Sequence, residues 1–438
     1  MHVLTTAVAS SELIERAGHV VAVRGQMIEA NGPLAQVGER CRIEAARGAS
    51  IDAEVVGFNR GITVLMPLAG VEGISVGEPV MALAQMPDVP VGRELLGRVV
   101  NAFGAPVDDL GPLRTAARRP LRSQPPPAMR RARIDTALET GVAVIDSMLT
   151  LAKGQRVGLF SGSGVGKSTL MGMIAREAQA AVTVVALIGE RSREVREFIE
   201  DQLGPEGLKR SVVVVATADE PAVVRSKAAY AATTIAEHFR DQGQDVLLLV
   251  DSLTRFAMAR REIGLAVGEP PTARGYTPSV FSELPQLCER GGPGVGAGSI
   301  TGVYTVLVDG DDMNEPVADS LRAILDGHIV LSREIANSGY FPAVDVLQSV
   351  SRLHAVVGEP ADLEAARIVR AACAAHERNR QLIEIGAYKP GINGTLDRAV
   401  QLMPAIRESF AQRPGHKRPR AESLARLADL AKQLGAQP

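Results

Sequence analysis

The chain has 438 residues, of which 46% are hydrophobic and 22% are charged, and its formal net charge is −2. The length predicts more than one domain, and the composition is ordinary for a soluble globular chain. The small net charge provides no general attraction to nucleic acid or to anionic membranes. Because only 3% of the residues are aromatic and none is Trp, side chains on which bases could stack are scarce. We therefore expect no nucleic-acid partner.

The cysteines and the N-terminal residues give an expectation about compartment. The three cysteines lie far apart and form no metal-type cluster, which is typical of a reduced cytosolic protein. Glu12, Glu15 and Arg16 interrupt the apolar stretch of residues 1–20, so this stretch lacks the apolar core of a signal peptide. No run of about 18 apolar residues occurs elsewhere. We expect a cytoplasmic protein with at most peripheral membrane contact.

Short β-type runs follow one another between residues 19 and 84. Turns that carry glycine, such as 31–33 and 70–73, separate them. Short strands at this spacing predict a small β-barrel, in an N-terminal domain with a short leading segment over residues 1–90. The predicted strands are 19–23, 42–45, 53–57, 61–66 and 79–83.

Residues 91–360 are predicted to form a central α/β domain. It begins with a connecting region, 91–133, whose part from 117 to 133 is rich in Pro and Arg and has the composition of an extended linker. Beyond residue 134, apolar strand-like runs alternate with helix-like runs, which predicts a mostly parallel sheet covered on both faces. The predicted strands are 156–160, 181–188, 211–216, 245–250 and 299–307.

Residues 361–438 are rich in Ala, Arg, Glu and Leu and predict a C-terminal helical domain. Two stretches, 387–394 and the basic stretch 413–420, interrupt the helical pattern. The basic stretch fits either a solvated loop or a contact with acidic lipid or a partner.

A glycine-rich turn that ends in Gly166-Lys167-Ser168 stands between an apolar strand-like run and a helix-compatible run. This arrangement predicts a phosphate-binding P-loop, in which backbone N–H groups converge on phosphate oxygens. Lys167 supplies charge at the β/γ-phosphates, and the Ser168 hydroxyl can ligate Mg²⁺. Ser161 stands where the first Gly is usual, and an ordinary Gly-rich turn is the alternative. The predicted nucleotide-binding residues are Gly162, Ser163, Gly164, Val165, Gly166, Lys167, Ser168 and Thr169.

Two carboxylates follow apolar strands of the same predicted sheet. Asp251 ends the run 245–250, where a magnesium-side carboxylate is expected, although a helix N-cap aspartate is the alternative. Glu190 follows the run 181–188 and should emerge at the same edge of the sheet as the P-loop. A carboxylate there can polarise an attacking water, but the charged residues after Glu190 also fit a solvated helix start.

Several motifs together carry a resemblance to a known family. The chain is similar to the catalytic subunits of the rotary-ATPase superfamily (F/V-type) at 162–168, 189–194, 251–255, 342–345 and 349–352. Within that superfamily it most resembles the type III secretion ATPases, above all the flagellar protein export ATPase. The stretches that favour this group are 139–146, 257–264, 268–271, 308–316 and 324–333.

The resemblance implies a RecA-like ATPase domain that hydrolyses ATP with Mg²⁺, with assigned residue roles. Glu190 would orient the water, Lys167 and Arg191 would hold the γ-phosphate side, and Ser168 and Asp251 would serve Mg²⁺. Arg255 would add charge nearby.

The resemblance further implies that Arg352 is an arginine finger for the neighbouring subunit. Without the family, a surface arginine would be the better interpretation. The resemblance also places Phe341 against adenine, with Tyr388 as the second wall of the adenine site. The alternative for Phe341 is a packing role, which is more common for an aromatic residue before Pro.

The implied assembly is a homo-hexamer at the inner membrane. Implied partners are a stator-like regulatory dimer near the N-terminus, a central stalk protein, the export gate and substrate–chaperone complexes. The alternatives are a non-flagellar (virulence) type III secretion ATPase and a rotary ATP synthase catalytic subunit. A nucleotide-holding structural subunit is disfavoured by Glu190, and a hexameric RNA helicase by the balanced charge and the scarcity of aromatic residues.

Overall fold

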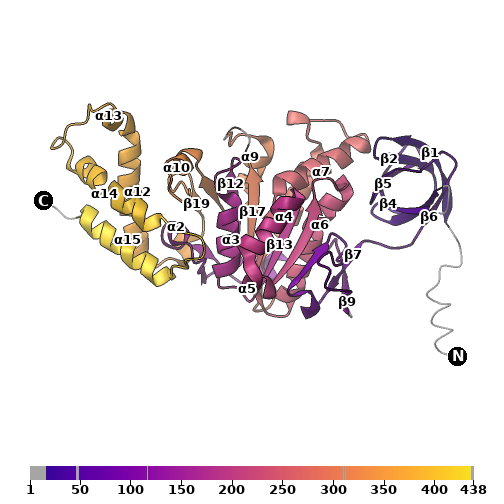
Figure 1. Cartoon of the computed structure of the whole chain (residues 1–438), viewed down its shortest axis with the longest axis horizontal. Helices are drawn as coiled ribbons and strands as arrows, with labels where there is room; N and C mark the ends of the chain where they lie inside the picture. Colours follow the sequence, from indigo (N-terminus) through magenta and orange to yellow (C-terminus); the bar gives the residue numbers. More distant parts are fainter. Residues whose placement is uncertain (1–15, 46–48, 116, 309, 311, 436–438) are drawn as a thin grey trace.

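The computed structural model describes residues 16–45, 49–115, 117–308, 310 and 312–435. Three parts follow one another along the long axis: a barrel of strands, a sheet covered by helices, and a group of C-terminal helices (Figure 1). Most of the stretch 1–20, on which the signal-peptide expectation depends, lies outside the described residues. No helix in the described ranges is long and apolar enough to cross a membrane.

Six strands close into an N-terminal barrel in the order β1-β2-β5-β4-β3-β6, which confirms the predicted barrel. Side chains alternate between interior and solvent, and Ile28, Ile43 and Leu65 fill the interior. The strand β2 was not among the predicted runs, because its Glu and Ala are weak strand formers and its pairing with β1 fixes it instead. The strands are β1 (Ala17–Arg24), β2 (Met27–Asn31), β3 (Arg40–Ala45), β4 (Ala49–Asn59), β5 (Ile62–Pro67) and β6 (Pro79–Ala82).

The central sheet has nine strands in the described ranges, and its main order is β19-β18-β12-β17-β15-β13-β14-β8. All pairs from β18 to β8 are parallel, as predicted, and the short β16 and β19 pair antiparallel. The five predicted strands are present, whereas the short β8 and β18 were not predicted. The strands are β8 (Arg98–Asn101), β12 (Arg156–Ser161), β13 (Val182–Glu190), β14 (Ser211–Thr217), β15 (Asp245–Asp251), β16 (Gly292–Pro293), β17 (Ser299–Leu307), β18 (Gly327–Leu331) and β19 (Val350–Ser351).

Helices cover both faces of this sheet. Val184 and Ala186 of β13 join the core beneath α6 (Ala222–Asp241), α7 (Leu253–Ala266), α8 (Pro278–Glu289) and α9 (Pro316–Ile324). Val185 and Leu187 join the core beneath α2 (Ala143–Met148) and α3 (Lys167–Glu177). Smaller elements complete the domain: η1 (Arg93–Leu95), η2 (Ala128–Arg130), β10 (Ala137–Leu138), β11 (Leu151–Ala152), α4 (Ser192–Glu197), η3 (Phe198–Leu203), α5 (Gly204–Lys209), η4 (Ala273–Gly275), α10 (Arg333–Asn337) and α11 (His354–Val357).

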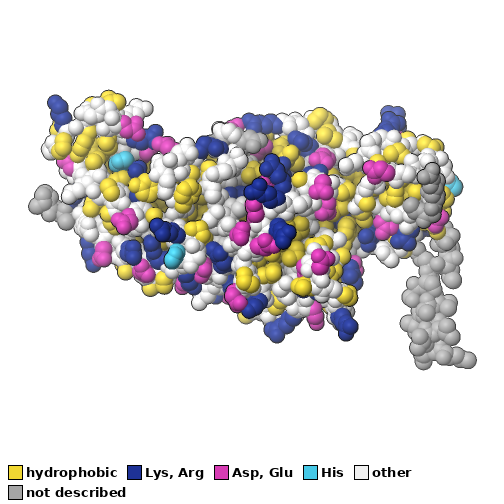
Figure 2. Space-filling view, viewed as in Figure 1, with side chains coloured by type: hydrophobic (Ala, Val, Ile, Leu, Met, Phe, Trp, Pro, Cys, Tyr) yellow, Lys and Arg dark blue, Asp and Glu magenta, His cyan; other side chains and the backbone are white. Residues whose placement is uncertain are grey.

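Among the contacts that join the barrel to the central domain are an ion pair and an apolar cluster. Lys227 Nζ of α6 lies 2.5 Å from Glu54 Oε2 of β4, and both side chains are largely buried. Burial raises the pKa of Glu54 and lowers that of Lys227, while the pairing opposes both shifts. Met66 of β5 packs against residues of α6 and α7, among them Ile263. Over one face of the whole molecule, acidic and basic side chains are interspersed (Figure 2).

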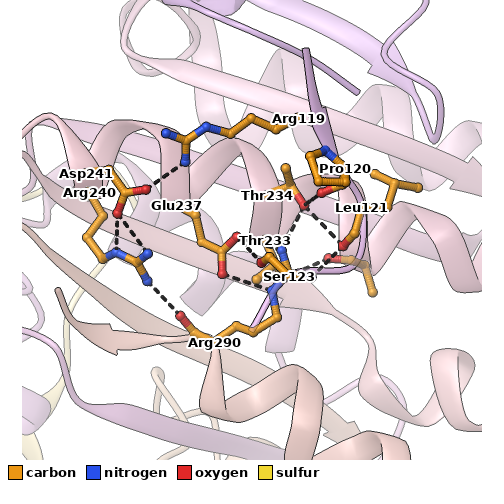
Figure 3. A network of polar contacts seen from close by, with 11 residues as sticks. Arg119, Pro120, Leu121, Ser123, Thr233, Thr234, Glu237, Arg240, Asp241 and Arg290 are labelled. Atoms are coloured by element: carbon orange, nitrogen blue, oxygen red, sulfur yellow. Dashed lines mark hydrogen bonds and ion pairs between the residues drawn. The ribbon is translucent and has the colours of Figure 1, made fainter. Parts of the chain in front are cut away.

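The Pro/Arg-rich stretch that was expected to be a linker is docked on the central domain at both ends, since Arg131 near its C-terminal end donates to the Gly291 carbonyl at 2.9 Å. Its first residues form β9 (Ala117–Pro120), antiparallel to β7 (Asp88–Val91). Beyond β9, the buried Arg290 donates to the Leu121 carbonyl at 2.7 Å and pairs with Glu237 at 2.6 Å. Ser123 donates to the same Glu237 carboxylate at 2.9 Å (Figure 3). Composition alone could not reveal partners that lie more than a hundred residues further along the chain.

The C-terminal helices are α12 (Pro360–Arg378), α13 (Arg380–Glu384), α14 (Gly394–Phe410) and α15 (Arg420–Gly435), interrupted where predicted. They share a core with α2 and α3. Buried Gln412 ties them to the central domain, because its side chain accepts from Ala143 N at 2.9 Å and donates to the Gly141 carbonyl at 2.7 Å. In the basic stretch, Arg418 donates to carbonyls at the end of α14, and Lys417 pairs with Glu139 at 3.2 Å.

Candidate active site

The predicted P-loop joins β12 directly to α3. Gly164 and Gly166 have φ values of 77° and 90°, in the left-handed region that glycine adopts without strain. α3 begins at Lys167, so its N-terminal N–H groups face the space that the loop encloses. A Cβ added at Gly166 would lie 3.4 Å from the Phe341 ring, which places that aromatic ring against the loop. The strand, loop and helix therefore form an anion-binding site.

Lys167 lies between the two predicted carboxylates. Its Nζ donates to Asp251 Oδ1 at 2.6 Å and lies 3.6 Å from Glu190 Oε1. Asp251 ends β15 and Glu190 ends the neighbouring β13, where Leu187 is in register with Asp251. The carboxyl edge of the sheet thus brings together Lys167, Asp251 and Glu190, which we call the Lys167 group. Burial alone would lower the pKa of Lys167, but Asp251 and Glu190 raise it above its ordinary value.

Glu190 is poised to exchange a proton near neutral pH. Burial, together with the nearby Asp251 carboxylate, raises the pKa of Glu190 to about 7, while the Lys167 ammonium opposes the rise. Glu194 on α4 also raises the pKa of Glu190 through a side-chain hydrogen bond, and that bond lowers the pKa of Glu194. A carboxylate with a pKa near the working pH is suited to accept a proton from water.

Asp251 is held by a residue that sequence reasoning missed. Thr305 of β17 donates from Oγ1 to Asp251 Oδ1 at 2.6 Å, and both side chains are buried. The only signal in the sequence is a hydroxyl near the end of a predicted strand, which does not identify its partner. Ser168 is exposed on the first turn of α3. The hydroxyl of Ser168 and the carboxylate of Asp251 supply oxygen donors of the kind that Mg²⁺ prefers, so the donor chemistry fits this ion.

The two other predicted phosphate-side arginines differ in environment. The Arg191 side chain is 83% exposed and pairs with Glu194 at 3.4 Å, so it does not join the Lys167 group. Arg255 lies on the first turn of α7, and its methylene groups pack beside Gly189, next to Glu190. The Arg255 Nε is buried without a hydrogen-bond partner among the described residues. A buried orphan donor beside the P-loop fits an anionic ligand.

Phe341 borders a cavity of about 320 Å³ between the central domain and the C-terminal helices. Phe410, at the end of α14, lines the same cavity, and the backbone N–H of Gln412 donates to the Phe341 carbonyl at 2.9 Å. Sequence reasoning missed Phe410, because an aromatic residue at a helix end cannot be distinguished from a core residue by pattern. The aromatic side chains of Phe341 and Phe410 thus line this cavity, and an aromatic ring can stack on a base such as adenine.

The contacts of Tyr388, the predicted second wall, differ from those of Phe410. Tyr388 does not line the cavity, and its hydroxyl donates to Asp397 on the first turn of α14. Phe410 ends the same helix of 17 residues, which at ~1.5 Å per residue is roughly 25 Å long. Tyr388 therefore bonds to the start of α14, whereas Phe410 lies at its end.

Arg352 lies at the opposite edge of the sheet from the P-loop of its own chain. The backbone N–H of Arg352 donates to the Asp326 carbonyl at 3.0 Å, and the backbone N–H of Asp326 donates to the Arg156 carbonyl at 2.8 Å. Arg156 begins β12 and the P-loop follows its end, so the strand of six residues, roughly 20 Å long, separates them. Arg352 therefore does not join the Lys167 group of its own chain.

These features define a P-loop nucleotide-binding domain: the sheet is parallel with helices on both faces, the P-loop lies at its carboxyl edge, and two carboxylates lie beside the P-loop lysine. Comparisons with known proteins show which family of nucleotide-binding proteins the chain matches. The nucleotide-binding domain of the ATP synthase alpha/beta family matches residues 141–351, and its beta-barrel domain matches residues 20–83. The T3SS EscN ATPase C-terminal domain matches residues 359–429.

Whole-chain relatives agree with these matches. The flagellum-specific ATP synthase of Bacillus subtilis (strain 168) is 50% identical over 431 residues, which are 98% of each chain. The type 3 secretion system ATPase of Xanthomonas euvesicatoria is 48% identical over 91% of this chain and 90% of its own. The solved structure of the assembled ATPase EscN from enteropathogenic E. coli has a TM-score of 0.90 at 40% identity, covering 94% of this chain and all of its own. The chain therefore belongs to the ATP synthase alpha/beta family, among the flagellar and type III secretion ATPases, and it is an ATPase.

Proposed function

We propose that the chain hydrolyses ATP to drive protein export by a flagellar type III secretion apparatus. The flagellum-specific relatives from Bacillus subtilis and Treponema pallidum are 50% and 53% identical to this chain over more than nine tenths of its length. The type III secretion relatives from Xanthomonas and Sinorhizobium are 48% and 46% identical. Other flagellum-specific relatives, at 44–49%, overlap the secretion ATPases, so the flagellar system is the first candidate because of the relatives at 50% identity or more, and a virulence-type secretion system is the second. The EscN-type C-terminal domain disfavours a rotary ATP synthase subunit.

The observation that carries the catalytic proposal is the Lys167 group at the carboxyl edge of the sheet. We assign Lys167 to the β/γ-phosphates, where its ammonium would exchange part of its contact with Asp251 for phosphate oxygens. Glu190 orients the attacking water and accepts its proton. Its pKa of about 7 leaves a large fraction of the side chain ionised at neutral pH. We assign Arg255, whose buried Nε has no hydrogen-bond partner among the described residues, to the same anion.

We assign Ser168 and Asp251 to Mg²⁺. When bound, Mg²⁺ neutralises charge on the phosphate oxygens. Thr305 and Lys167 both donate to Asp251 Oδ1 and keep the carboxylate in place. The P-loop backbone and α3 supply the remaining donors toward phosphate.

We assign Arg352 to the active site of a neighbouring copy, because its own P-loop lies a strand length away. An arginine supplied in trans is worth ~10³–10⁵ in rate in GTPases. One chain that carries both Glu190 and Arg352 can close a ring through one repeated head-to-tail interface. We propose a homo-hexamer. The solved relative EscN is described as assembled, and a second structure holds it with its central stalk EscO.

The proposal extends to partners and location. A central stalk protein in the ring is supported by the EscN–EscO complex. A stator-like regulatory dimer, the export gate and substrate–chaperone complexes are proposed from family resemblance, with a cytoplasmic location peripheral to the inner membrane. The formal net charge of −2 and the scarcity of aromatic residues disfavour nucleic acid as a partner.

The direct test combines Glu190→Gln with a gene deletion. The purified Glu190→Gln chain should bind a fluorescent ATP analogue with unchanged affinity and lose steady-state hydrolysis. Glu197→Gln, on the neighbouring helix and paired with Arg193, is the matched control and should hydrolyse normally. Deletion of the gene should abolish flagellar filaments and leave cellular ATP synthesis intact. Normal turnover by Glu190→Gln contradicts the catalytic assignment, and normal filaments in the deletion strain contradict the flagellar one.

A further inference from the structure

Arg352 is held by the C-terminal end of α9. Its Nη2 donates to the Arg322 carbonyl at 3.1 Å. Arg322 lies in the last turn of α9, where carbonyl groups have no intrahelical donor and carry partial negative charge. A guanidinium has five N–H donors, so this bond to the carbonyl leaves donors of the exposed Arg352 for another partner. The end of α9 therefore sets where the Arg352 guanidinium stands.

The Arg322 side chain fixes that helix end to the segment that precedes α9. Its Nη1 donates to the Met313 carbonyl at 3.4 Å, and its Nη2 lies 3.8 Å from Asp319 Oδ1. The Met313 side chain packs against the central core. At the other end of α9, Glu315 accepts from the N–H groups of Val317 and Ala318. Arg322 thus contacts the segment before α9 through its side chain and contacts Arg352 through its backbone carbonyl.

We propose that Arg322 is a positioning residue for Arg352, and that it acts on the active site of the neighbouring copy rather than on its own. The proposal rests on the assignment of Arg352 as a trans arginine. Without the contact to Met313, the last turn of α9 loses its side-chain tether, and the carbonyl that holds Arg352 moves with it. Misplacement of a catalytic group by ~1 Å can cost on the order of 10² in rate.

Mixed rings separate this role from a merely structural one. Glu190→Gln subunits keep Arg352 and lack the catalytic carboxylate, so they act only as arginine donors. Arg352→Ala subunits keep Glu190 and act only as catalytic sites. Isolated rings that contain both hydrolyse ATP at interfaces between the two types. Arg322→Ala is then added to one type at a time. Absence of hydrolysis in the parent mixture would overturn the proposed function itself.

Arg322→Ala in the arginine donor should lower kcat of the mixed rings by at least about tenfold, with KM for ATP unchanged because the other subunit binds the nucleotide. The same substitution in the Arg352→Ala subunit should change neither constant. Arg322→Lys in the donor, which keeps a charged donor toward Met313, should give an intermediate rate. Arg367→Ala, which removes a helical arginine paired three residues back with Glu364, is the matched control and should have no effect.

The proposal is overturned if both Arg322 variants in the donor match the unsubstituted donor. It is equally overturned if the loss follows the subunit that supplies the catalytic site. Because the assay uses rings that have been isolated first, a failure to assemble cannot be mistaken for a loss of rate. If Arg322→Ala subunits stay out of rings, the Arg322→Lys donor decides the outcome alone.

Discussion

Thr305 Oγ1 donates a 2.6 Å hydrogen bond to Asp251 Oδ1, the same carboxylate oxygen that accepts from Lys167 Nζ. Thr305 and Asp251 lie on the neighbouring parallel strands β17 and β15, and both are buried. The Asp251 carboxylate that we assign to Mg²⁺ is therefore oriented by the sheet itself.

Thr305→Val should weaken the response to Mg²⁺. Valine keeps the shape of threonine and removes the donor, so the Asp251 carboxylate loses its orienting bond. Loss of such a supporting hydrogen bond typically costs ~10–100-fold in metal affinity. A titration of ATPase rate against Mg²⁺ should show a half-maximal concentration about tenfold higher. Thr301→Val, on the same strand but bonded to Gly154, is the control. Equal titrations for both variants would refute the assignment.

The activity should depend on the ionisation of Glu190. Because the pKa of Glu190 is raised to about 7, kcat/KM should fall as the pH falls through 7, by about tenfold per pH unit further down. Glu194 raises this pKa through its hydrogen bond and its charge. Glu194→Gln should therefore move the acid limb of the profile to lower pH, whereas Glu197→Gln should leave it in place. An acid limb that stays put or moves to higher pH in Glu194→Gln contradicts this account.

The cavity beside Phe341 should bind adenine through Phe410. Phe410→Ala should raise KM for ATP about tenfold with a small change in kcat, since stacking of a base on an aromatic ring contributes ~1–3 kcal/mol. Tyr388→Ala should leave KM unchanged, because Tyr388 lies at the other end of α14. Steady-state kinetics of the two variants distinguish the walls. A larger KM for Tyr388→Ala than for Phe410→Ala would reverse the assignment.

The buried pair in Figure 3 should be essential for stability. Arg290→Met leaves Glu237 charged and buried, which should lower the free energy of unfolding by ~3–5 kcal/mol. The double variant Arg290→Met/Glu237→Leu removes the uncompensated charge and should recover part of the loss. Urea unfolding of the three chains measures both effects. A double variant less stable than Arg290→Met alone would show that the pair is not the main source of the loss.

Much of the fold and part of the site could be predicted from the sequence, because their signals are local. The P-loop, Asp251 and Glu190 each follow an apolar run, and the edge rule for parallel sheets brings them together. The barrel and the helical end also follow from pattern and composition.

The remaining features depend on contacts between distant segments. Thr305 and Phe410 lie in separate elements and acquire their roles only when β17 meets β15 and α14 meets the Phe341 segment. Residues 117–123 have the composition of a linker, but the Glu237–Arg290 pair that holds them is invisible to local pattern. Local pattern also could not show that the Tyr388 hydroxyl bonds to Asp397 or that Phe410 lines the cavity.

The central claim is that each active site is shared between two copies of the chain. The most direct measurement is the ATPase rate of isolated rings formed from equal amounts of Glu190→Gln and Arg352→Ala subunits. Each variant alone should be inactive. With random assembly, about one quarter of the interfaces combine an intact Glu190 with an intact Arg352, so the mixture should recover a substantial fraction of the wild-type rate. Mixed rings that assemble and remain as inactive as either parent would contradict the account.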